Sequence, residues 1–139
     1  MTDYTTDVAA WAAEQAELLR LRAANELDWD NLAEEIEAVG ISQKREVYAR
    51  LKLICHHLLK WRYQPEHQSR SWRATIRTQR RDLAKVLQQN PSLSSYAAAE
   101  LADAYAHGRE AAEDETGLLH LPQACPWSIE QVLDIDYLP

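Results

Sequence analysis

Apolar residues recur every three or four positions along nearly the whole chain, and no segment alternates apolar and polar residues in steps of two. Spacing of this kind marks one face of an α-helix, whereas a half-buried strand requires a period of two. Only three glycines and five prolines interrupt the 139 residues. We therefore expect an all-α fold: an up-and-down bundle of four or five main helices with a short C-terminal helix, in a single helical domain over residues 1–139.

Capping and breaking residues predict where the helices begin and end. Thr5 or Thr6 caps a first helix that reaches about Ala24. Asp28 caps a second, short helix, and Gly40 suits the left-handed position that follows a helix. Further helices are expected over residues 42–62, from Ser69 or Ser71 to Asn90, over 94–116, and after the capping-box signal at 128–131.

The apolar positions of these helices predict the core. From the N-terminus they are Val8, Trp11, Ala12, Leu18 and Leu19; Leu32, Ile36 and Val39; Val47, Leu51, Ile54, Leu58 and Trp61; Trp72, Ile76, Leu83 and Leu87; and Ala97, Leu101, Ala104, Gly108 and Ala111. The last set is rich in small residues, which allow two helices to approach closely.

The sequence favours a cytoplasmic protein. It has no cationic start followed by the apolar run of a signal peptide, and its apolar stretches are too short to cross a membrane. Cys55 and Cys125 lie far apart and form no CxxC pair. Free thiols are the simplest interpretation, with one disulfide as the alternative.

Charge is strongly segregated along the chain. Residues 1–43 carry ten acidic side chains against two basic ones, a balance of −8. Residues 44–85 carry twelve basic side chains against three acidic ones, a balance of +9, and residues 86–139 return to −8. The net charge of −7 argues against attraction of nucleic acid or anionic lipid to the whole surface, but not against binding by the basic middle.

An arginine-rich strip is the main candidate binding surface. At about 100° per residue, Arg70, Arg73, Arg77 and Arg81 share one side of the fourth expected helix, and Arg80 lies beside them. Two interpretations compete. The strip packs against acidic helices, through Glu34, Glu35 and Glu37 or through Glu110, Glu113 and Asp114, or it binds an acidic protein or a nucleic acid.

A ribonuclease is one alternative function. Arg50 and His57 lie two turns apart on one flank of an expected helix, and the spacing is similar to the R-x(4–6)-H signature of the helical HEPN nucleases. In that chemistry His moves a proton while Arg stabilises a strained phosphate without a metal. Adjacent His56 points elsewhere.

A carboxylate-bound metal is the second alternative. The Glu34-Glu35-x-Glu37 segment is similar to the acidic helices of all-α NTP pyrophosphohydrolases, although it misses their EExxE spacing by one residue. Glu110, Glu113 and Asp114 could complete such a site from another helix. Solvated acidic faces are the simpler explanation, and no cofactor is expected.

Six segments in order resemble a bacterial family, domain of unknown function 29. They are LDWDNLAEEIE (27–37), HLLKWRYQP (57–65), SWRATIR (71–77), NPSL (90–93), ETG (115–117) and CPW (125–127). The resemblance implies an all-α bundle without an assigned activity and supplies no catalytic residue. Our leading hypothesis rests on the segregation of charge: a non-enzymatic interaction module, expected as a homodimer, that uses the arginine strip.

Overall fold

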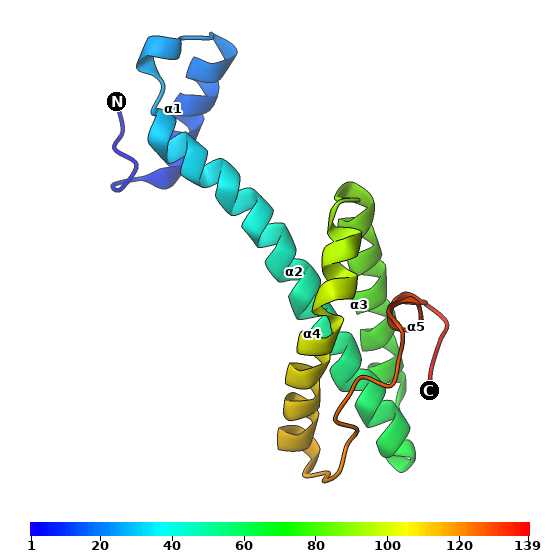
Figure 1. Ribbon diagram of the computed structural model, residues 1–139. Coiled ribbons are helices and arrows are strands. Elements are labelled where there is room, and N and C mark those ends of the chain that lie inside the picture. The colour runs from blue at the N-terminus through cyan, green and yellow to red at the C-terminus, as the bar shows by residue number, and fades with distance from the viewer. The chain divides into compact units, whose positions relative to one another are not determined.

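The structure, a computed structural model, describes residues 1–139 and is built from helices alone (Figure 1). The elements are α1 (Val8–Arg20), η1 (Ala24–Glu26), α2 (Trp29–Tyr63), η2 (Pro65–His67), α3 (Arg70–Gln89), α4 (Leu93–Thr116) and α5 (Ile129–Leu133). The expected all-α fold, with four main helices and a short C-terminal one, is confirmed. None of these helices combines the length and the apolar character needed to span a membrane.

The predicted helix end at Gly40 is wrong. Helix α2 continues through this position to Tyr63, which merges the second and third expected helices. A glycine inside a helix costs only about 0.5–1 kcal/mol relative to alanine, so it weakens a helix without ending it. The residues on both sides of Gly40 continue the helical hydrogen bonding, and no proline follows.

The chain divides into two compact units, residues 1–41 and residues 42–139, and α2 contributes residues to both. In the first unit, the N-cap of α1 is Asp7 and not the expected Thr5 or Thr6, because the Asp7 side chain accepts the N–H of Ala10. Helix α1 also ends at Arg20, before the expected Ala24. Trp11 and Gln15 are buried. The Trp11 indole donates to the Asp28 carboxylate at 2.9 Å, and the Gln15 side chain accepts the Asp28 N–H at 2.8 Å.

Most of the apolar residues expected in the core of this first unit are exposed. Val8 and Leu19 of α1 are 51% and 49% exposed, and Ile36 and Val39 of α2 are 70% and 63% exposed. These side chains are exposed because the first unit contains too few helices to cover them. With two helices in the unit, each helix covers only one side of the other, so the remaining apolar side chains face solvent.

The second unit contains the core of the protein. Residues 42–63 of α2, then α3 and α4, run alternately up and down, and α5 packs against α3 and α4 (Figure 1). The buried apolar side chains are Val47, Leu51, Ile54, Cys55, Leu58 and Leu59; Ile76, Leu83 and Val86; Leu93, Ala97, Leu101, Ala104, Tyr105 and Ala112; and Leu121, Trp127 and Val132. The predicted faces of these helices are therefore largely confirmed, with Ala112 more buried than Ala111.

Several predicted helix ends are also confirmed. Ser69 caps α3 by accepting the N–H of Trp72 at 3.2 Å. Gly117 ends α4 in the left-handed conformation, with φ 73°. Ser128 and Gln131 form the reciprocal capping box that begins α5. The caps at Ser69, Gly117 and Ser128 fix where α3 begins, where α4 ends and where α5 begins.

Candidate polyanion-binding surface

Four arginines form an exposed face on α3, which we call the arginine face: Arg70, Arg73, Arg77 and Arg81. Ile76, Leu83 and Val86 turn the opposite side of the same helix into the core. Because the apolar side is anchored and the helix is capped at Ser69, the arginine side must face solvent. The local sequence thus determines where these four side chains lie.

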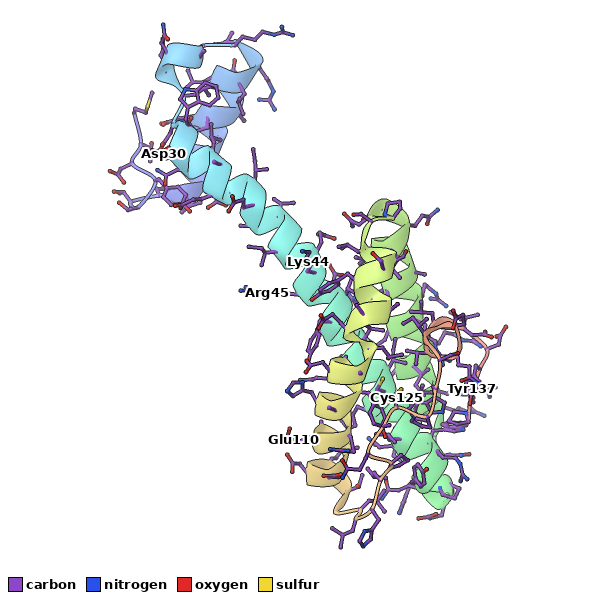
Figure 2. All side chains as sticks on the ribbon, viewed as in Figure 1. Asp30, Lys44, Arg45, Glu110, Cys125 and Tyr137 are labelled. Carbon is purple, nitrogen blue, oxygen red and sulfur yellow. The ribbon has the colours of Figure 1, made fainter.

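The arginines of this face have no protein partner. None of them takes part in an ion pair of the structure, whose basic members are Arg20, Arg50, His56, Lys60, His67, His107 and Arg109. Of the α4 carboxylates expected to cover them, Glu113 pairs with Arg109, and Glu110 points outward from α4 (Figure 2). The four guanidinium groups therefore keep all their donors available.

A shallow hollow of about 430 Å³ lies within this face. It is lined by Arg70, Arg73, Ala74 and Arg77. The short side chain of Ala74 leaves room between the longer arginines. An anionic group that enters this hollow can receive hydrogen bonds from more than one guanidinium, which suits phosphate or carboxylate oxygens.

Arg80 does not belong to the arginine face, in contrast to its place in the predicted strip. Its side chain is 1% exposed. The guanidinium donates to the carbonyls of Val132, Tyr137 and Gln131 at 2.8, 2.6 and 3.1 Å. Burial lowers the pKa of Arg80 from its ordinary value. Arg80 therefore fastens the C-terminal segment to α3 and is not available to a partner.

One edge of the arginine face meets the C-terminal segment. Arg73 and Arg77 share a small pocket of about 30 Å³ with Ile135, Asp136 and Leu138. That volume holds about one or two water molecules and is too small for a phosphate group. Asp136 also places a negative charge at this edge. An anionic partner is consequently best received on the outer side of the face, away from Asp136.

The structure gives Arg50 and His57 separate surroundings. Arg50 donates to Glu46 at 2.9 Å, to Gln79 at 3.0 Å and to Asp82 at 3.4 Å. His57 is half-buried, and its Nδ1 donates to the carbonyl of Leu53 at 3.0 Å. Burial lowers the pKa of His57. Arg50 is therefore held by two carboxylates and an amide and shares no partner with His57.

A buried lysine cluster was missed by the sequence analysis. The ammonium of Lys60, 5% exposed, donates to Glu115 at 2.7 Å and lies 4.4 Å from the ring centre of Trp72. His56 Nε2 donates to the other oxygen of Glu115 at 2.6 Å. The hydrogen bond from Lys60, with that from His56, lowers the pKa of Glu115. The cluster joins α2, α3 and α4.

The sequence did contain a signal for this cluster. Lys60, Trp72 and Glu115 belong to three of the six segments that carry the family resemblance, 57–65, 71–77 and 115–117. These segments converge in space because the lysine needs both a carboxylate and an aromatic face when it is buried. Lys60 and His56 both bind the Glu115 carboxylate and so connect α2 to α4, and we assign the cluster a structural role.

The carboxylates proposed as metal ligands do not form a metal-binding group. Glu34 and Glu37 lie exposed on α2 in the first unit, and Glu110 and Asp114 lie exposed on α4 in the second. Nowhere in the structure do three or more His, Cys, Asp or Glu side chains gather in an arrangement that could hold a metal ion.

Both cysteines are free thiols. Cys55 is buried in the core, and Cys125 is half-buried and donates from its Sγ to the Trp127 carbonyl at 3.3 Å. The neighbouring Cys55 thiol lowers the pKa of Cys125 to about 7, and Cys125 together with burial raises the pKa of Cys55.

Fold and surface together define a small all-helical protein with one uncompensated basic helix face. A family model for the domain of unknown function DUF29 matches residues 4–138, so the chain belongs to that family and the resemblance of its six segments is confirmed. No curated protein and no solved structure matches the chain.

Proposed function

We propose that this chain is a non-enzymatic, cytoplasmic interaction module that binds an anionic macromolecule, a nucleic acid or an acidic protein, through the arginine face. The observation that carries the proposal is the set of four exposed arginines without any carboxylate partner, in a chain whose net charge is −7. Unpaired arginines gathered on one side of a helix do not stabilise the fold by ion pairing. Their concentration there is explained by a partner.

The chemistry of the face fits an extended anion. Each guanidinium can donate two parallel hydrogen bonds to one phosphate or carboxylate. Arg73, Arg77 and Arg81 follow one another four residues apart, which places neighbouring guanidinium groups about 6 Å apart along the helix axis. A linear anion that lies along α3 meets one arginine in every turn. The acidic remainder of the surface restricts binding to this helix.

The enzymatic alternatives have weaker support. Arg50, the residue that would stabilise a phosphate in the ribonuclease hypothesis, already donates to two carboxylates. The carboxylate-metal hydrolase hypothesis depends on a cluster that the acidic residues do not form. No observation in the structure favours either enzymatic hypothesis over the interaction module.

Binding of model polyanions tests the proposal. Wild-type protein should bind single-stranded RNA or poly-glutamate at low salt, because its arginines remain free to exchange water and counterions for the ligand. For RNA held by four arginines, the logarithm of the association constant should fall with the logarithm of salt concentration with a slope of about −3. Fluorescence anisotropy with labelled probes measures both affinity and slope.

Charge reversal supplies the matched comparison. Arg73→Glu with Arg77→Glu should weaken binding about tenfold or more, since two attractive contacts become repulsive. Arg45→Glu with Arg62→Glu changes the net charge equally at exposed positions of α2 and should leave the affinity nearly unchanged. The proposal fails if wild type binds no probe at low salt, or if both variants lose affinity to the same extent.

A further inference from the structure

A second charged strip lies on the first unit. Asp30, Glu34 and Glu37 project from one side of α2, within about 60° of one another at the helical repeat, and Ile41 follows on the same side. All three carboxylates are exposed, and none forms an ion pair or a side-chain hydrogen bond in the structure. We call these three residues the acidic strip.

The acidic strip and the arginine face have matching spacings when they are followed in opposite directions. From Arg70 the next arginines come three and then four residues later, at Arg73 and Arg77. From Glu37 the preceding carboxylates come three and then four residues earlier, at Glu34 and Asp30. In both sets the first and last residues are seven positions apart, or about 10 Å along the helix.

We propose that the arginine face binds the acidic strip of a second copy of this chain, with the two helices antiparallel. Glu37, Glu34 and Asp30 of one copy then lie opposite Arg70, Arg73 and Arg77 of the other. The inference rests on the proposed function, because it names an acidic protein partner for the same face. Each copy carries both surfaces, and the dimer that we infer makes this contact twice about a two-fold axis.

The strength of this contact follows from its composition. The paired charges are exposed, and pairs of that kind contribute up to about 1 kcal/mol each, less as salt is added. Ile41, 49% exposed, and Ala74 in the hollow of the arginine face add a little apolar surface. The dimer is therefore reversible and sensitive to ionic strength, and a bound polyanion competes with it for the same arginines.

Two reversed variants test the pairing. One carries Asp30→Lys, Glu34→Lys and Glu37→Lys, and the other carries Arg70→Glu, Arg73→Glu and Arg77→Glu. Wild type, freed of nucleic acid by nuclease treatment and a high-salt wash, should dimerise at low salt. Each variant alone should be monomeric, because like charges meet at both contacts. An equimolar mixture should form a heterodimer, because opposite charges meet again at both.

Sedimentation velocity and native mass spectrometry measure the assembly, and circular dichroism checks that each variant is folded. The matched controls are Glu17→Lys with Glu110→Lys and Asp114→Lys, and Arg20→Glu with Arg45→Glu and Arg62→Glu, which alter exposed charges outside the two strips. Both controls should dimerise as wild type does.

Three outcomes overturn the inference: a monomeric wild type at low salt, folded variants that still form homodimers, or a mixture of the variants that stays monomeric. The proposed function is tested separately. The acidic-strip variant keeps its arginine face, so it should bind single-stranded RNA at least as well as wild type. If this variant binds RNA and the wild type is monomeric at low salt, the proposed dimer is wrong and the proposed function stands. If the arginine-reversed variant binds every polyanion probe like wild type, the proposed function fails instead.

Discussion

Arg80 connects α3 to residues 131–137 through three hydrogen bonds from a single buried guanidinium. A buried cation is stabilised only when its donors are satisfied, and here three backbone carbonyls accept them. Those carbonyls belong to a segment with few other backbone partners. The side chain therefore determines where the C-terminal segment lies.

Arg80→Met should destabilise the protein by about 2–4 kcal/mol, because it leaves several buried carbonyls without a donor. Arg81→Met, one residue further along α3 and exposed, should change the free energy of unfolding by less than about 0.5 kcal/mol. Urea denaturation followed by circular dichroism gives both values. Equal effects of the two substitutions would contradict the role assigned to Arg80.

The same two residues show what a helical wheel can predict. The wheel placed Arg70, Arg73, Arg77 and Arg81 on one side of the helix, outside its apolar face, because the anchored face of α3 is visible in the local spacing. It did not indicate whether another helix would cover them. It misplaced Arg80, which lies at the margin of that face. The acceptors of Arg80 are more than fifty residues away in sequence, and no local pattern indicates them.

At the scale of helices, two glycines inside helices have opposite surroundings. A Cβ atom added at Gly108 of α4 would lie 2.8 Å from the Lys52 carbonyl oxygen and 3.1 Å from the His56 nitrogen, both backbone atoms of α2. A Cβ atom added at Gly40 would meet nothing within 4 Å. Only the first glycine is needed for close helix packing.

The same substitution should therefore have opposite effects at the two sites. Gly108→Ala should lower the stability by about 1–3 kcal/mol, because α4 must move away from α2. Gly40→Ala should raise it by about 0.5–1 kcal/mol, because alanine favours the helical backbone. Thermal and urea unfolding of both variants provide the measurement. A loss of stability in Gly40→Ala would show that α2 is not a continuous helix at this position.

The spacing of apolar residues predicted that these segments are helices and which side of each helix is apolar. It did not predict that α2 is one continuous helix, nor how many other helices pack against each apolar side. The Val47–Leu58 face was predicted correctly because helices pack on it as the pattern requires. Ile36 and Val39 have the same kind of spacing and are exposed. Sequence spacing indicates which side of a helix is apolar and does not indicate whether another helix is present to cover it.

At the scale of the whole molecule, the two units differ in the amount of core they contain. The first unit buries one apolar side chain, Trp11, together with the polar Gln15, whereas the second buries a continuous cluster of apolar residues from α2, α3, α4 and α5. Little buried apolar area means a small free-energy cost of local opening. The first unit should therefore open more often.

Amide hydrogen exchange should show this difference directly. Amides of α1 should exchange faster than those of α4 and of residues 47–59 of α2, whose protection should approach the stability of the whole second unit. Exchange followed by mass spectrometry of peptic fragments resolves these segments. Uniform protection across α1 and α4 in monomeric protein would contradict the inferred difference in stability.

Every position of the arginine face is an arginine, although the chain also has lysines on α2 and α3. Acetylation neutralises lysine ammonium groups, but it does not act on guanidinium. Amine acylation therefore cannot remove the charge of these four side chains. The fraction of the arginine face that is occupied by a ligand is instead governed by the salt concentration and by the relative concentrations of the anions that compete for the face.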